Sequence, residues 1–149
     1  PVRVTPPQTG SLGTIPASAL PGEAGPLFAD AQTRIRAGDY AGAEQSFRSF
    51  LDLFGDDPQA GQAQYWLGEA LYQQGAHAQS GEVFTAMLRA YPEDDLAPGA
   101  LVKLARSLRS VGQGERACAA LDQLPNVYPN TSPGIRALAA AERVSAECE

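Results

Sequence analysis

Apolar residues recur at helical spacing through most of this 149-residue chain. The clearest stretch is residues 65–72, and beyond Gly75 a second run contains Val83, Phe84 and Met87. Each run places its apolar side chains on one face of a helix. Glycine is the residue that most readily takes the left-handed conformation that ends a helix. The pattern therefore predicts two antiparallel helices joined at Gly75.

This pair of helices repeats with a period of 37 residues. Four sets of positions share that spacing: Gly38, Gly75 and Gly112; Ala43, Ser80 and Ala117; Phe47, Phe84 and Leu121; and Phe54, Tyr91 and Tyr128. A fixed period of roughly 20 to 50 residues indicates stacked supersecondary units that share one continuous core. Proteins of this kind bind other molecules, so we expect binding and not catalysis.

The period divides the chain into a linker and one repeat domain. Residues 1–26 are rich in Pro and Gly and poor in large apolar residues, which is typical of a flexible linker. Residues 27–148 form the repeat domain, with repeats at 27–57, 58–94 and 95–131 and a capping helix at 132–148. Ser132 and Pro133 favour the start of that helix as its N-cap and first helical residue. We expect the capping helix to cover the apolar face of the third repeat.

The net charge of −6 and the pI of about 4.7 argue against nucleic acid as a partner, because nucleic acid requires a basic surface. The chain also has no polybasic segment for anionic lipid and no apolar run of transmembrane length. We therefore expect neither nucleic-acid binding nor direct membrane insertion.

The repeat resembles the tetratricopeptide pattern, which has Leu-Gly in its first helix, Ala and Phe four residues apart in its second, and a closing Pro. The second copy offers Leu67-Gly68, then Ser80 and Phe84, then Pro92. The third copy carries a related series 37 residues later, and the first copy is the most degenerate. This resemblance implies an all-α fold of three helix-turn-helix repeats in a right-handed superhelix.

A narrower resemblance rests on residues 38–43, 65–72, 103–104, 117–121 and 128–129. These segments are similar to the C-terminal repeat domain of the periplasmic Tol-Pal system proteins called YbgF or CpoB, the cell division coordinators. The resemblance covers residues 27–148. It implies a periplasmic adaptor that binds TolA and a peptidoglycan synthase, and so coordinates peptidoglycan synthesis with outer-membrane constriction during division.

The same resemblance implies a signal peptide and a trimerising coiled coil upstream, neither of which is in this sequence. We therefore expect trimers only with that coiled coil, and a monomer for this fragment. Two alternatives remain open: another repeat scaffold, such as an outer-membrane assembly lipoprotein-like module, or the binding module of a larger envelope enzyme. A cytosolic co-chaperone is disfavoured because that family's clamp needs Lys and Asn at first-helix positions held here by Phe28, Gln32, Tyr65 and Glu69.

In repeats of this kind the first helix of each pair lines the concave face. Its exposed positions are the candidate protein-binding groove: Phe28, Gln32, Arg36, Gln62, Tyr65, Glu69, Tyr72, Gln73, Val102, Arg106 and Arg109. The set is aromatic in the middle with arginines at both ends, and these residue types are enriched at binding hot spots. The alternative is that Tyr65 and Tyr72 pack between repeats while the arginines are merely solvated. Trp66 is expected in the core.

The two cysteines allow one intramolecular pairing. Cys118 lies near the start of the third repeat's second helix, and Cys148 lies near the end of the capping helix. If these helices are antiparallel neighbours, the two sulfurs meet. We favour the disulfide, which would place the protein outside the reducing cytosol, over two separate thiols.

Catalytic and cofactor motifs fail on inspection. His77 is the only histidine, and one histidine cannot make a metal cluster by itself. Residues 112–117 match a dinucleotide-binding spacing, but they follow a predicted helix where that motif requires a strand. The acidic linkers at 56–57 and 93–95 lack the alternating ligands of a calcium loop. We expect no enzyme activity, no cofactor and no metal.

Overall fold

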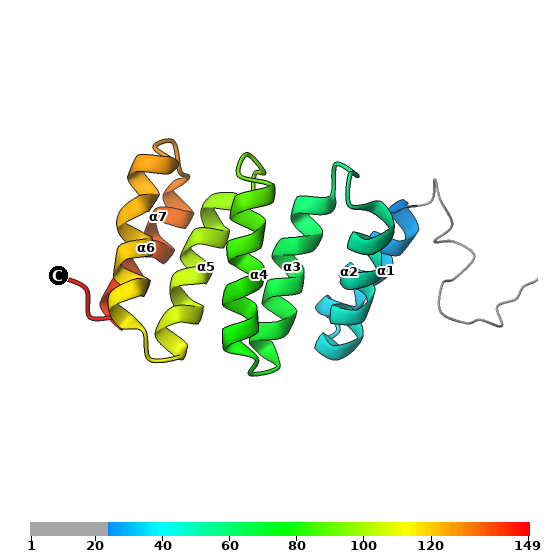
Figure 1. Cartoon of the computed structure of the whole chain (residues 1–149), viewed down its shortest axis with the longest axis horizontal. Helices are drawn as coiled ribbons and strands as arrows, with labels where there is room; N and C mark the ends of the chain where they lie inside the picture. Colours follow the sequence, from blue (N-terminus) through cyan, green and yellow to red (C-terminus); the bar gives the residue numbers. More distant parts are fainter. Residues whose placement is uncertain (1–23) are drawn as a thin grey trace, which may run out of the picture.

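The computed structural model describes residues 24–149, and these form seven α-helices and no strand. The helices are α1 (Ala24–Arg36), α2 (Tyr40–Phe54), α3 (Ala60–Gln73), α4 (His77–Ala90), α5 (Ala97–Ser110), α6 (Gly114–Val127) and α7 (Pro133–Ser145). They stack as three antiparallel pairs in one row, followed by α7 (Figure 1). The predicted all-α repeat fold is thus confirmed.

The linker predicted at residues 1–26 lies mostly outside the described residues. Its last three residues belong to α1, which begins at Ala24. Pro26 is compatible with this start because the first turn of a helix makes no use of its backbone N–H groups. Ala24 is buried on the inner face of the same helix together with Leu27 and Phe28, so the helix begins earlier than predicted.

The three glycines of the 37-residue period end the first helix of each pair. Gly38, Gly75 and Gly112 have φ values of +81°, +84° and +81°. A residue with a Cβ atom is strained in this region, whereas glycine is not. The predicted turn is therefore confirmed, and it has the same geometry in all three repeats.

Two tyrosines tie consecutive repeats together in the same way. The Tyr91 hydroxyl donates to the Gly55 carbonyl at 3.2 Å, and the Tyr128 hydroxyl donates to the Pro92 carbonyl at 2.8 Å. The two donors are 37 residues apart, and so are the two acceptors. The aromatic position of the period therefore fastens each second helix to the start of the preceding connection.

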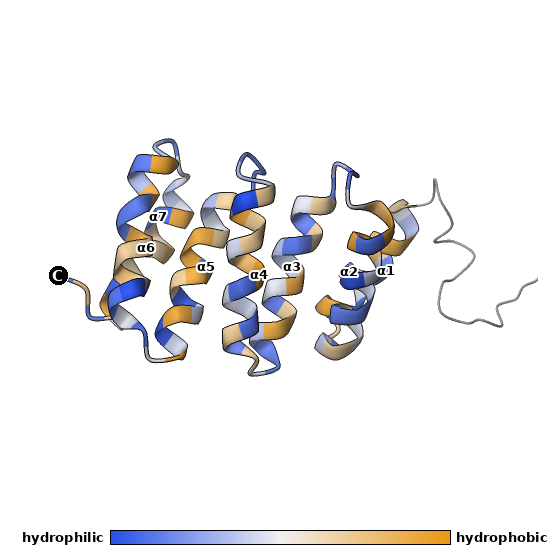
Figure 2. Cartoon of the chain, viewed as in Figure 1, coloured by the Kyte–Doolittle hydropathy of each residue, from blue (hydrophilic) through white to orange (hydrophobic). Residues whose placement is uncertain are grey.

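The acidic connections organise the start of the next helix. The Asp57 carboxylate accepts from the Gln59 amide, and the Asp94 carboxylate accepts from the Leu96 amide, both at 2.8 Å. These short turns lead into α3 and α5, and the connections are hydrophilic (Figure 2). Such bonds explain why aspartate recurs there, as expected for turn-forming acids.

Close helix contact explains the small residues of the pattern. A Cβ atom on Gly68 would lie 2.7 Å from the ring of Phe84, which is fully buried. Glycine at this position therefore lets α3 and α4 approach until the ring fills the space between them. The Ser80 hydroxyl donates across the pair to the Gly68 carbonyl at 2.7 Å, because the close approach brings that carbonyl within reach.

Helix α7 is capped as predicted but packs differently from expectation. The Ser132 side chain accepts from the Ile135 amide at 3.3 Å, which confirms the N-cap. However, α7 packs mainly on α5 and approaches α6 at only a few residues. In Figure 1 it lies behind α6 instead of extending the row. Ala139 on its inner face belongs to one cluster with Leu101 and Val102 of α5 and with Leu121 and Leu124 of α6.

Candidate functional site

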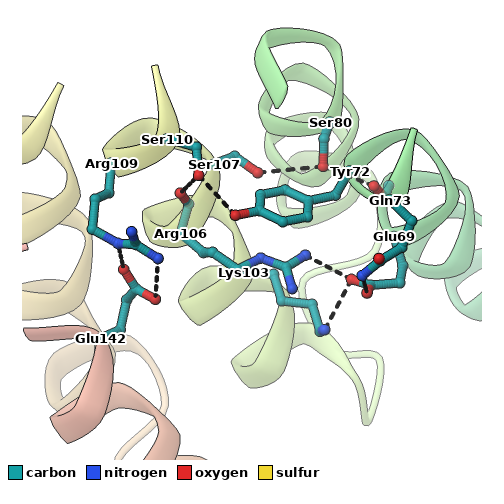
Figure 3. A network of polar contacts seen from close by, with 11 residues as sticks. Glu69, Tyr72, Gln73, Ser80, Lys103, Arg106, Ser107, Arg109, Ser110 and Glu142 are labelled. Carbon is teal, nitrogen blue, oxygen red and sulfur yellow. Dashed lines mark hydrogen bonds and ion pairs between the residues drawn. The ribbon is translucent and has the colours of Figure 1, made fainter. Parts of the chain in front are cut away.

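A network of polar contacts links α3, α5 and α7 along the side formed by the first helices (Figure 3). At its centre the Glu69 carboxylate accepts from Lys103 Nζ at 2.9 Å and from Arg106 Nη2 at 2.6 Å. The three side chains retain only 13 to 24% exposure. Glu69 and Arg106 are separated by 37 residues, so the same position carries opposite charges in consecutive repeats. This charge pair is the electrostatic link between the second and third repeats.

The protonation state of Glu69 follows from its partners. Burial by itself would raise the pKa of this carboxyl group. The hydrogen bond from Arg106 and the charge of Lys103 outweigh burial and lower the pKa to about 2. The carboxylate is therefore charged at any physiological pH, and the ion pairs persist.

Tyr72 and Arg106 hold each other in place. The Arg106 guanidinium carbon lies 3.5 Å from the centroid of the Tyr72 ring, a cation–π contact. The Tyr72 and Ser110 hydroxyl oxygens are 2.7 Å apart, and Ser110 donates to the Arg106 carbonyl at 2.9 Å. Tyr72 is consequently the donor in the first of these bonds. The predicted alternative of freely solvated arginines is wrong for Arg106.

The Arg109 guanidinium makes two contacts with the carboxylate of Glu142 on α7. Nε donates to Oε2, and Nη2 donates to Oε1 at 3.4 Å. The hydrogen bond that Arg109 donates to the Glu142 carboxylate raises the pKa of Arg109. Glu142 is only 9% exposed and did not appear among the predicted site residues. The sequence did contain a signal for it, because Glu142 lies at helical spacing from Ile135 and Ala139, on the inner face of an amphipathic helix. A carboxylate there requires a cation on the opposing helix.

Three predicted groove residues are buried instead of exposed. Phe28, Tyr65 and Val102 occupy one position of the period and are 2%, 8% and 6% exposed. The Tyr65 ring packs edge-on against Trp66 and Phe84, and burial raises the pKa of its hydroxyl to about 12. The rings of Phe28 and Tyr65 pack against aromatic rings of the second helix in their own pair, so these side chains point into the core. The expected aromatic centre of the groove is therefore part of the core, as is much of Trp66.

The remaining predicted residues form what we call the first-helix surface. Arg36 and Gln73 are exposed, while the other members are partly buried: Gln32, Gln62, Glu69, Tyr72, Arg106 and Arg109. Gln73 donates to Glu69 at 2.8 Å and so belongs to the same network. The surface is polar and charged, with its central side chains fixed by one another. Its use for protein binding stays a prediction.

The predicted disulfide between Cys118 and Cys148 is present, with their Cα atoms 5.6 Å apart. Cys118 lies in the first half of α6, and Cys148 follows the end of α7. The bond fastens the end of the chain to the start of α6. It therefore holds α7 from its C-terminal side.

Residues 24–149 hold no metal-binding cluster and no membrane-spanning helix. No group of three or more His, Cys, Asp or Glu side chains in that range is placed to hold a metal ion. None of the helices of the described chain has both the length and the hydropathy needed to cross a bilayer. His77 lies with its ring centroid 4.3 Å from that of Tyr72, so its ring packs beside the polar network.

Comparison with solved structures places the fold. PcrH from Pseudomonas aeruginosa has a TM-score of 0.68 and 18% identity, over 83% of this chain and 89% of that one. The Yersinia enterocolitica type III secretion chaperone SycD, in complex with a peptide of the translocator YopD, has a TM-score of 0.65 and 16% identity, over 80% of this chain and 91% of that one. A type III secretion complex from Aeromonas hydrophila has a TM-score of 0.69 and 16% identity, over 87% of this chain and 82% of that one. At these identities the similarity shows the fold alone.

Comparison by sequence identifies the repeats. No curated protein matches the sequence. Two family models, both described as a tetratricopeptide repeat, match residues 28–95 and residues 99–131. Together these segments cover most of the described helices, and their boundaries agree with the helix pairs. The chain belongs to the tetratricopeptide-repeat family.

Proposed function

We propose that this protein is a non-enzymatic adaptor that binds a segment of a partner protein on its first-helix surface. The carrying observation is the network in which Glu69 holds Lys103 and Arg106 while Arg109 holds Glu142. A surface whose polar groups are already fixed loses little side-chain entropy when a partner binds. Tetratricopeptide repeats are protein-binding scaffolds, which supports a protein as the ligand.

The proposed compartment is the periplasm. The disulfide between Cys118 and Cys148 supports an oxidising environment, because disulfides persist there and are rare in the cytosol. The resemblance of residues 65–72 and their neighbours to Tol-Pal system proteins supports the same compartment. On this basis TolA and a peptidoglycan synthase are the proposed partners, and coordination of peptidoglycan synthesis with outer-membrane constriction is the proposed role.

The test is calorimetric titration of the chain with the periplasmic part of TolA and with a periplasmic peptidoglycan synthase domain from the same organism. The diagnostic variant combines Arg36→Glu with Gln73→Lys, because both side chains are exposed and neither is needed for burial. We expect saturable binding that this variant weakens by about tenfold, roughly 1.4 kcal/mol. Arg89→Glu, an exposed change on α4, is the matched control and should bind normally.

Two results would count against the proposal in different ways. Absence of saturable heat with TolA and with the synthase domain would exclude the Tol-Pal role. Binding that is equally strong in the Arg36 and Gln73 double variant would exclude the first-helix surface as the contact.

A second candidate function is a chaperone that holds a segment of a client protein. It is favoured by the fold shared with SycD, solved with a YopD peptide, and with PcrH, solved with the chaperone binding region of PopD. A chaperone would keep its client soluble in stoichiometric amounts, whereas an adaptor would bind a client that is already folded and soluble. Co-expression followed by light scattering separates the two.

A further inference from the structure

A hollow of about 370 Å³ separates α6 from α7. Its walls are mainly apolar and come from both helices: Leu121, Leu124 and Pro125 of α6, and Ala139 and Ala140 of α7. We call this feature the terminal hollow. Its volume lies at the lower end of the range for sites that bind ligands or side chains. Nothing in the polar network described above uses it.

The period of the chain shows why the hollow exists. Pro125 stands 37 residues after Leu88 and 74 after Leu51. Leu51 and Leu88 pack against the core where the next repeat's first helix covers the second helix, whereas Pro125 is exposed. At the third position the next helix, α7, has moved onto α5. The terminal hollow is thus an inter-repeat seam without the full cover that the other two seams have.

Helix α7 is held so that it does not close this seam. At its start it is joined to α6 through the short segment 128–132. At its end the disulfide of Cys148 fastens it to the beginning of α6. In the middle, Glu142 is engaged with Arg109 of α5. With both ends and the middle restrained, α7 cannot shift along α6 to fill the space.

The inner seams also show what fits on such a surface. On α4 a Cβ atom at Gly81 would lie 3.5 Å from Ser107 and 3.8 Å from Leu104, so α5 packs closely along its partner. Both α3 and α5 are helices of 14 residues with buried alanines on the packing face. An amphipathic helix is therefore the element that this chain itself places at the equivalent sites.

The charges at the edge of the hollow indicate which kind of helix would bind there. Arg136 lies at the edge of the hollow, is exposed, donates to the Thr131 carbonyl and makes no ion pair within residues 24–149. Arg143, at the same edge, is already paired at 2.7 Å with Asp122, which also lines the hollow. The guanidinium of Arg136, which has no carboxylate partner among the described residues, therefore favours a helix that carries a carboxylate next to its apolar face.

We propose that the terminal hollow is a docking site for an amphipathic helix of a partner protein, which inserts an apolar side chain between α6 and α7 and pairs a carboxylate with Arg136. This mode of binding, a helix in a groove, uses one or two apolar anchors at helical spacing. The site is separate from the first-helix surface and does not depend on it. The protein thereby has a second protein contact at the end of its repeat stack.

The probe is a blocked synthetic peptide of residues 58–74, which contains α3, the helix that covers α2 in this fold. It carries one acid, Glu69, and no basic residue. Titrated into the ¹⁵N-labelled full chain, it should cause saturable amide shifts centred on Leu121, Leu124 and Ala140. A peptide with Leu67→Pro cannot form the helix and should not bind.

Two variants of the protein test the site. Ala140→Trp fills the hollow and should weaken peptide binding by at least about tenfold. Arg136→Glu reverses the edge charge and should weaken binding by about fivefold, and since Arg136 is exposed this variant keeps the fold if Ala140→Trp does not. Arg116→Glu, an exposed arginine elsewhere on α6, is the control and should bind normally.

The proposal is overturned if the peptide causes no saturable shifts, or if the shifts fall on the first-helix surface. Equal binding of the helical and the Leu67→Pro peptides would exclude a helical occupant. Unchanged affinity in both Ala140→Trp and Arg136→Glu would exclude the hollow itself.

Discussion

The seam between α4 and α5 and the seam between α6 and α7 start from equivalent second helices but are packed differently. In α4, Phe84 and Met87 are fully buried, and α5 packs along the helix. In α6, Leu121 and Leu124 stand at the same positions, are 3% and 5% exposed, and border the terminal hollow. The difference comes from the helix that follows, since α5 begins a new repeat while α7 turns back onto α5. A repeat motif therefore determines its own fold but not how its outer face is covered.

The largest expected effect separates the two seams directly. Met87→Ala should lower the free energy of unfolding by about 4 kcal/mol, because it opens a cavity in a closed seam. Leu124→Ala, the equivalent change 37 residues later, should cost about 2 kcal/mol, because the side chain already borders open space. Urea unfolding followed by circular dichroism measures both. Equal losses would mean that the terminal seam is as tightly packed as the inner one.

The disulfide belongs only to the terminal seam. Replacing Cys118 and Cys148 together by Ser should lower stability by about 3 kcal/mol, because the cross-link restricts the unfolded chain over a sequence separation of 30 residues. The loss should appear in oxidising buffer and vanish in reducing buffer, where the wild type has lost the same bond. Thermal unfolding in both buffers provides the measurement. Identical midpoints under oxidising conditions would show that the bond does not form.

Ion pairs join α3 to α5 and α5 to α7, and the one between α3 and α5 responds to pH. The pKa of Glu69 is lowered to about 2 when folded, below its ordinary value of 4.5. Its contribution is therefore complete above pH of about 4.5 and is lost as the pH falls toward 2. Glu69→Gln should cost about 2 kcal/mol at pH 7, allowing for partial exposure, and should flatten the decline of stability below pH 4.5. If the free energy of unfolding falls equally below pH 4.5 in wild type and variant, this link is contradicted.

The smallest expected effect concerns a feature that the repeats share, the tyrosine hydroxyl bond to the preceding connection. Tyr91→Phe and Tyr128→Phe each remove one hydroxyl bond to a carbonyl of the preceding connection. Each should cost about 1 kcal/mol, and the two losses should be equal within error. Differential scanning calorimetry of the two variants makes the comparison. A loss confined to one variant would show that the difference between the seams extends into the connections.

The structure also changes what is expected of the arginines. From the sequence, Arg106 and Arg109 were candidates for contact with a partner, with solvated side chains as the alternative. Arg106 in fact stacks on Tyr72 and pairs with Glu69, and Arg109 pairs with Glu142. Reversing either charge now places two carboxylates side by side, so loss of stability is expected along with any loss of binding. Arg36 and Gln73, which are exposed, are the better probes of the surface.

Much of this protein was determined by its sequence alone. The repeated pattern predicted the 37-residue period. The left-handed glycines such as Gly75 and the cap at Ser132 depend on residues within one or two turns. Local steric and hydrogen-bonding preferences are therefore sufficient to predict them. With only two cysteines, the pairing of Cys118 and Cys148 was also within reach.

Only the tertiary structure decided which neighbours the charged and terminal elements would have. Glu69 and Arg106 meet because the lateral register of α3 and α5 brings equivalent positions together, and no local pattern encodes that register. The position of α7 depends on Glu142 meeting Arg109 and on Ala139 joining the cluster of Val102, contacts between residues more than 30 positions apart. The terminal hollow follows from that position. Periodicity describes what the repeats share, whereas the end of the stack is determined by contacts that occur only once.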